Sequence, residues 1–97
     1  MEPLSLDWVV VASRDQVAAD LETEVIVLGL QDGVYYGMDG VASRVWALVQ
    51  RPAALRDVLA TLLAEFDVNE ATCRADLLAF VTELVQKGLV TRVRDGA

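Results

Sequence analysis

The sequence predicts a single α+β domain, because strand-like and helix-like patterns occupy different parts of the chain. Before Asp39 the apolar residues come in short valine-rich runs, which are typical of β-strands. After Asp39 they recur at three- and four-residue intervals, the spacing of amphipathic helices. Strands followed by helices favour an α+β arrangement over alternating β-α units. The 97 residues fit one domain, 1–97, and leave no room for two.

Two short strand-like runs precede the main hairpin. Residues 8–11 (WVVV) are apolar and indicate a strand, but the sequence does not show what it pairs with. Residues 1–14 are therefore either an N-terminal extension of the domain or an extra strand. A second short strand is expected at residues 16–19.

A β-hairpin gives the clearest strand signal. Residues 24–30 (EVIVLGL) are rich in β-branched side chains, and the Asp32-Gly33 pair that follows is a common turn sequence. Residues 34–38 (VYYGM) are then the returning strand. Period-2 alternation divides this strand into two faces. The face expected to point away from the core carries Tyr35 and Gly37, and the face expected to point into the core carries Val34, Tyr36 and Met38.

Three segments with helical spacing follow the hairpin, at residues 40–50, 54–65 and 70–87. Asp39 and Asn69 are suitable N-caps for the first and third helices, and Pro52 ends the first. Gly88 is a natural residue just beyond the third helix, before a closing strand at residues 89–93. Three helices with a terminal strand resemble a winged-helix arrangement.

The residue inventory argues against an enzyme, a metal site and a bound cofactor. The chain has no histidine, which removes the commonest general base and metal ligand. Its one cysteine, Cys73, cannot form an internal disulfide or a zinc site, and on an apolar helix face it is more typical of a small buried residue than of a nucleophile. Glycine-rich phosphate loops are also absent from the sequence.

The charge excludes further classes of partner. A formal net charge of −7 disfavours contact with nucleic acid. No apolar run reaches the length of about 20 residues that a membrane helix needs, and the N-terminus does not read as a signal peptide. We therefore expect a cytoplasmic protein with no nucleic-acid or membrane partner.

Two features could carry recognition. Residues 34–38 are either an open sheet edge, which can accept an added peptide strand, or a strand covered by a neighbour. The general tendency of proteins to protect their sheet edges favours the covered strand. The third helix has an apolar arc of roughly 160°, wider than an ordinary core-facing stripe needs. Either part of this arc lines a groove, with Phe80 at its margin beside Asp76 and Glu83, or the whole arc belongs to the core.

The order and spacing of these elements resemble the PqqD-like family. One similar segment is EVIVLGLQDGVYYGMDGVASRVWALV, with its apolar strand, Asp-Gly turn, aromatic pair and tryptophan-bearing helix. The other is DVLATLLAEFDVNEATCRADLLAFVTELVQKGLV, which ends on Leu-x-x-x-Gly-Leu-Val. The resemblance covers roughly residues 15–93, and it is carried by the combination of motifs rather than by a single one.

The resemblance implies a three-stranded antiparallel sheet packed on three helices, in a non-enzymatic module that holds the leader of a ribosomally made precursor peptide. The leader would add as a strand beside residues 34–38, against the third helix. The peptide-binding residues would be Val34, Tyr35, Tyr36, Gly37, Met38, Cys73, Asp76, Leu77, Phe80, Glu83 and Leu84. A free-standing protein of this kind is most similar to the leader-binding protein of lasso-peptide pathways, whose partners are a leader protease and an ATP-dependent cyclase.

Three other functions stay open on the sequence. The nearest is the pyrroloquinoline-quinone form of the same family, a peptide chaperone for a radical SAM enzyme. Another is a winged-helix transcription regulator, although the exposed side of the third helix carries more acids than bases. The last is a dimerisation module that pairs its strand edge with a second copy.

Overall fold

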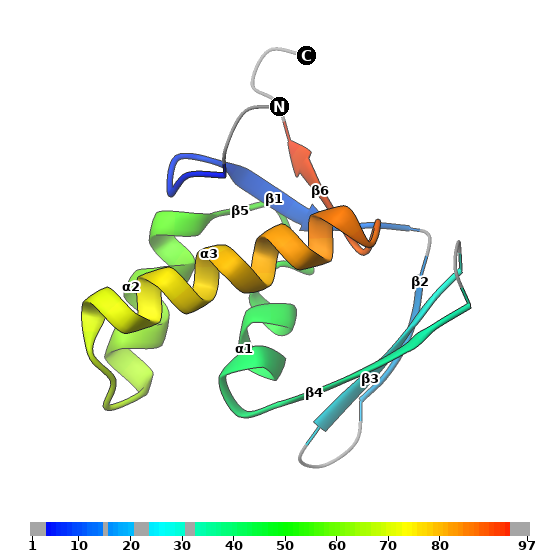
Figure 1. The fold of residues 1–97 in the computed structure, drawn as a ribbon, viewed down its shortest axis with the longest axis horizontal. Coiled ribbons are helices and arrows are strands. Elements are labelled where there is room, and N and C mark those ends of the chain that lie inside the picture. The colour runs from blue at the N-terminus through cyan, green and yellow to red at the C-terminus, as the bar shows by residue number, and fades with distance from the viewer. Residues whose placement is uncertain (1–3, 15, 21–23, 31–32, 94–97) are drawn as a thin grey trace.

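The computed structural model describes residues 4–14, 16–20, 24–30 and 33–93, and in them shows three helices and two small antiparallel sheets (Figure 1). The strands are β1 (Val9–Ala12), β2 (Gln16–Asp20), β3 (Glu24–Gly29), β4 (Tyr35–Asp39), β5 (Ala53–Ala54) and β6 (Val90–Val93). The helices are α1 (Gly40–Leu48), α2 (Leu55–Glu65) and α3 (Glu70–Gln86). The predicted α+β class and its three helices are confirmed.

The first sheet has the order β2-β3-β4 and is antiparallel throughout. Its central strand, β3, buries every second residue, so that Val25 and Val27 face the helices at 8% and 0% exposure. Such alternation is what a sheet with one covered face requires. This is the three-stranded antiparallel sheet that the family resemblance implied, and it includes the predicted strand at residues 16–19.

The turn between β3 and β4 ends in a glycine bulge. The Gly33 amide donates to the Gly29 carbonyl at 2.8 Å, and the Gly29 amide donates to the Val34 carbonyl at 3.0 Å, so two residues oppose one. Gly33 takes a φ of +68°, which glycine adopts without steric cost. The rest of the predicted turn, residues 31–32, lies outside the described residues.

The prediction that Val34 faces the core is wrong. Its side chain is 46% exposed, whereas Met38 on the same face is 4% exposed. The hairpin projects beyond the helices at this end (Figure 1), so alternation alone does not decide burial at this end of the strand. The strand itself begins one residue later, at Tyr35.

The second sheet has the order β5-β1-β6. The N-terminal run at residues 8–11 is therefore a paired strand, because β1 lies between β5 and β6 with Val10 opposite Ala53 on one side and Arg92 on the other. The very short β5 was not expected from the sequence, since two alanines have no strand signature.

Local signals explain both ends of α3. The Asn69 side chain accepts a hydrogen bond from the Thr72 amide at 3.1 Å, which confirms the predicted N-cap. At the other end Gly88 has a φ of +76°, and the Leu89 amide donates to the Leu84 carbonyl at 2.9 Å. This Schellman motif ends the helix and turns the chain directly into β6. Asp39 also occupies the N-cap position of α1, but its side chain makes no capping bond.

The helices and both sheets share one hydrophobic core. Its fully buried side chains come from every part of the chain: Val10, Val27, Val45, Val49, Leu55, Leu62, Val58, Val81, Leu89 and Val90. Trp46 of α1 is 3% exposed and belongs to this core.

Candidate peptide-binding site

Strand β4 is an open sheet edge, because it pairs with β3 on one side and with no other described strand on the other. In an antiparallel pair, residues that bond across the pair alternate with residues whose N–H and C=O groups point outward. Since the Val34 carbonyl bonds to Gly29, the groups of Tyr35 and Gly37 point away from β3. Of the two possibilities that the sequence left open for this strand, the structure has the open edge.

A groove separates β4 from the C-terminal half of α3. It has a volume of about 290 Å³. We call it the β4–α3 groove, and its lining residues are Tyr35, Tyr36, Gly37, Met38, Phe80, Glu83, Leu84 and Lys87. The open edge of β4 therefore has side chains of α3 opposite it, and both lie against the same space.

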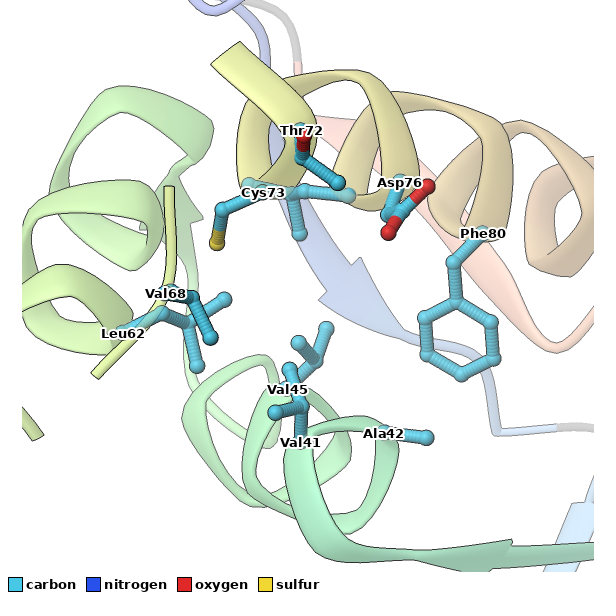
Figure 2. A pocket seen from close by; sticks show the side chains of 10 residues that line it. Val41, Ala42, Val45, Leu62, Val68, Thr72, Cys73, Asp76 and Phe80 are labelled. Carbon is cyan, nitrogen blue, oxygen red and sulfur yellow. The ribbon is translucent and has the colours of Figure 1, made fainter. Parts of the chain in front are cut away.

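A second, mostly apolar cavity of about 310 Å³ lies between α3 and α1 (Figure 2). We call it the α1–α3 cavity, and its lining residues are Val41, Ala42, Val45, Leu62, Val68, Thr72, Cys73, Asp76, Leu77 and Phe80. For comparison, an engineered apolar cavity of about 150 Å³ binds benzene. The α1–α3 cavity has room for a large apolar side chain.

Phe80 joins the two spaces, since it lines both. Figure 2 shows its ring extending from α3 toward Ala42 of α1, at one side of the α1–α3 cavity. Asp76 lies one helical turn earlier and Glu83 about one turn later, so the aromatic ring is flanked by carboxylates along α3.

The charged groups near these spaces are mixed in sign. Asp76 and Glu83 are exposed acids, and the Lys87 ammonium lies 5.9 Å from the centre of the Tyr36 ring. Desolvation raises the pKa of the Cys73 thiol, and the nearby Asp76 carboxylate raises it further. A buried thiol whose pKa is raised stays protonated at neutral pH and is a poor nucleophile.

Ten of the eleven residues expected to bind peptide line one of the two spaces, and Val34 lines neither. The lining residues that the sequence analysis did not single out are Lys87 in the groove and Val41, Ala42, Val45, Leu62, Val68 and Thr72 in the cavity. Val41 belongs to an apolar helical stripe that indicated core packing, so the sequence held no signal that 37% of it would remain exposed. The apolar arc of α3 divides between core and cavity, since Val81 is fully buried whereas Phe80 lines the cavity; the first of the two alternatives therefore holds.

Among the residues that the structure describes, no group of histidine, cysteine, aspartate or glutamate side chains could hold a metal ion. In the same residues, no helix is both long and apolar enough to cross a membrane.

Comparisons with known proteins agree with this geometry. Residues 24–90 match the model of the family described as coenzyme PQQ synthesis protein D (PqqD). A solved structure of TbiB1 in complex with the TbiA(beta) leader peptide is 33% identical, with a TM-score of 0.78, and the match covers 88% of this chain and 99% of that one. A lasso peptide synthetase B1 complexed with the leader peptide is 22% identical, with a TM-score of 0.64 over 84% of this chain and 96% of that one, which supports the fold. A search of curated proteins found no match.

Proposed function

This chain belongs to the PqqD family, and we propose that it binds the leader segment of a ribosomally made precursor peptide and presents it to modifying enzymes. One observation carries the proposal. The open edge of β4 lies across a groove from α3, in a chain 33% identical to a protein that was solved with a leader peptide bound.

The leader would bind by adding a strand to β4. The outward N–H and C=O groups of Tyr35 and Gly37 are two residues apart, which is the spacing at which a neighbouring strand forms its bonded pairs. Backbone bonds of this kind supply affinity and register, but they do not distinguish one peptide sequence from another.

Side chains of the leader would supply the selectivity. Alternate residues of an added strand point toward α3, where Leu84 and Phe80 offer apolar contact in the β4–α3 groove. Beyond Phe80, the α1–α3 cavity would accept a larger apolar side chain. Asp76 and Glu83 favour a leader with a basic residue near its apolar anchors, because a positive charge beside Phe80 is attracted by both carboxylates and by the aromatic ring.

In this proposal the chain itself catalyses nothing. Its partners would be a leader protease and an ATP-dependent cyclase, the enzymes of the lasso-peptide pathways to which the family resemblance points. A leader that is held on this protein keeps the rest of the precursor close to an enzyme bound to the same protein, which raises the effective concentration of the substrate.

A direct titration tests the proposal. The protein would be titrated with the leader segment of the precursor encoded beside its gene, and with a peptide of the same composition in scrambled order. We expect the leader to bind with a Kd far below about 1 mM, the value that corresponds to only ~4 kcal/mol, and the scrambled peptide to bind at least tenfold more weakly. Equal binding of the two peptides, or none of either, refutes the proposal.

The family model favours a second candidate, because its description is a coenzyme PQQ synthesis protein. In that case the bound peptide would be delivered to a radical SAM enzyme rather than to a protease and cyclase. The same titration with the pyrroloquinoline-quinone precursor peptide separates the two candidates, since the leader that binds more tightly identifies the pathway.

A further inference from the structure

We propose that Lys87 recognises an acidic side chain of the leader, two residues after the apolar residue that contacts Phe80. The inference rests on the leader-binding function proposed above and names part of the sequence that a leader must carry. It adds a charged contact to the apolar contacts of the β4–α3 groove, at the end where β4 begins.

The side chain of Lys87 extends from the end of α3 to β4. Its ammonium lies 5.9 Å from the centre of the Tyr36 ring, and both residues line the groove. Glu83 stands four positions earlier on α3, in the order that favours a glutamate–lysine pair along a helix. In the described part of the chain, however, no carboxylate lies within ion-pair distance of this ammonium. The charge is therefore directed at the peptide-binding space and not along the helix.

An added strand would place one of its side chains beside this ammonium. The backbone groups of Tyr35 and Gly37 point outward, so these two residues would form the bonded pairs with the leader. Tyr36 and Met38 would form the non-bonded pairs, whose Cα atoms are only about 4.5 Å apart. Both face the helices, because Met38 is 4% exposed and Tyr36 packs partly against the core. Paired residues point to the same face, so the leader residue opposite Tyr36 points toward Lys87.

The neighbouring pair determines the spacing in the leader. Met38 lies two residues after Tyr36, at the end of β4 that leads into α1, and it lines the groove together with Phe80. Antiparallel pairing is more stable per residue and commoner than parallel pairing. A leader paired in this way reaches Met38 first and Tyr36 two residues later. Its apolar anchor is therefore opposite Met38, and the residue two places further on faces Lys87.

A carboxylate is the side chain that suits this second position. An ammonium donates hydrogen bonds and accepts none, and its bond to a carboxylate is about twice as strong as a bond between neutral groups. The Tyr36 ring and Leu84 keep water from part of the space, which strengthens the attraction relative to open solvent. Glu83 repels an acid placed nearer Phe80, so the charges of α3 favour an acid at one position of the leader and not at the other.

Charge reversal on both partners tests the inference. The leader of the precursor encoded beside this gene would be made with each aspartate or glutamate changed singly to lysine, and each peptide titrated against the wild type and Lys87→Glu. We expect one peptide to bind the wild type about tenfold more weakly than the unaltered leader does, and to recover with Lys87→Glu to within about threefold of the original pair. The matched control is Arg74→Glu, an exposed base of α3 that lines neither space, with which that peptide should stay weak.

The spacing is tested with the same peptides. Alanine replacements in the leader identify its apolar anchor as the residue whose loss is not additive with Phe80→Ala. The acid that couples to Lys87 should lie two positions after this anchor. An acid two positions before it would mean that the leader runs parallel to β4, and would overturn the inference as stated.

The outcomes separate this inference from the proposed function. Wild-type protein that does not bind the unaltered leader overturns the proposed function. A leader that binds but has no acid coupled to Lys87 overturns only the inference, since the ammonium is then solvated or bonded to the peptide backbone.

Lys87→Gln is a second variant, because it removes the attraction without adding a repulsive charge. It should bind the unaltered leader about fivefold more weakly and distinguish it less from the charge-reversed peptide. Lys87 is exposed, so both variants should keep the urea midpoint of the wild type. A glutamine variant that binds and discriminates as the wild type does would overturn the inference.

Discussion

The two small sheets of this protein differ in how they meet the helices: β5-β1-β6 has strands of two to four residues, whereas β2-β3-β4 has strands of five or six and its edge strand β4 lines a groove. In the β5-β1-β6 sheet, Val10 and Val90 are 0% and 1% exposed. In the β2-β3-β4 sheet, Val27 is fully buried but Tyr35 on the neighbouring strand is 70% exposed. The comparison indicates that the first sheet serves stability and the second is available for recognition.

The difference arises from how each sheet is tied to the helices. β1 and the residues beside it bond to the chain around α1, α2 and α3: the Ala12 amide donates to the Val49 carbonyl, the Ser13 amide to Leu89 and the Leu55 amide to Trp8. The Arg92 guanidinium also lies 4.1 Å from the centre of the Trp8 ring, which adds a cation–π contact between β6 and the N-terminal segment. Among the described strands β4 pairs only with β3, and its other edge faces the β4–α3 groove before the chain enters α1.

The largest expected effect is at the turn that joins α3 to the β5-β1-β6 sheet. Leu89 is fully buried between α3 and β6. Its replacement by alanine should lower the free energy of unfolding by about 3 kcal/mol, because the lost methyl groups leave a cavity. Urea denaturation measures this change. The matched control, Leu30→Ala at 55% exposure in the turn after β3, should cost no more than about 0.5 kcal/mol. Equal losses at the two positions would remove the distinction between the sheets.

A proline at the open edge should have the next largest effect, and it should fall on binding. Gly37→Pro removes an outward N–H group, which an edge strand tolerates but an added strand needs. We expect the leader Kd to rise about 30-fold, equivalent to ~2 kcal/mol for an unmade backbone bond, with little change in thermal stability.

Gly37→Ala is the control for that substitution. An alanine Cβ at this position meets no atom within 4 Å, so the variant should bind the leader as the wild type does. If Gly37→Pro binds normally, the leader does not pair with β4.

Phe80→Ala should weaken leader binding about tenfold, as expected for an aromatic anchor at an interface. Phe80 packs only partly against the core, so the loss of stability should be smaller than for Leu89→Ala. Leader titration and urea denaturation of the same variant measure both quantities. A stability loss as large as that of Leu89→Ala, with binding retained by the folded protein, would identify Phe80 as a core residue.

The smallest effect concerns Cys73, on the α3 side of the cavity. Its folded-state pKa is raised above the ordinary value of 9.0, so the folded protein holds the thiol proton more tightly than the unfolded chain. This contribution to stability is present below pH 9.0 and is lost as the pH rises through the raised folded-state pKa.

The wild type should therefore lose stability above pH 9.0 more steeply than Cys73→Ala, measured by urea denaturation across that range. The alanine variant is the control for the wild type, because it retains every titrating group except the thiol. Parallel pH profiles would show that the thiol is solvated rather than buried.

Most of the fold could be predicted from local signals. Three such signals are the β-branched run of β3, the Asn69 cap and the Gly88 terminator of α3. Each acts within a few residues, so it can be recognised in the sequence without the tertiary structure. The partners of β1 were not predictable, because β5 and β6 lie more than 40 positions away in the sequence and β5 has no strand signature. Long-range pairing depends on which surfaces the helices leave available.

The candidate site was predictable in part. The strand and helix that face each other were anticipated from the family resemblance, and their residues line the two spaces. The prediction for Val34 was wrong because alternation assigns a side chain to one face of the sheet but does not show how far along the strand the helices cover that face. Val41 was missed because its apolar stripe indicated core packing, and Lys87 because a charged residue at the end of a helix is usually solvated.

The sequence by itself determined the element types, the caps of α3, and the scarcity of residues suited to catalysis or metal binding, since these depend on composition and on contacts between near neighbours. The tertiary structure decided which strand is an edge, how far the hairpin projects beyond the helices, and that Phe80 lines both the groove and the cavity. Those features depend on the relative placement of surfaces distant in the chain, and periodicity carries no information about that placement.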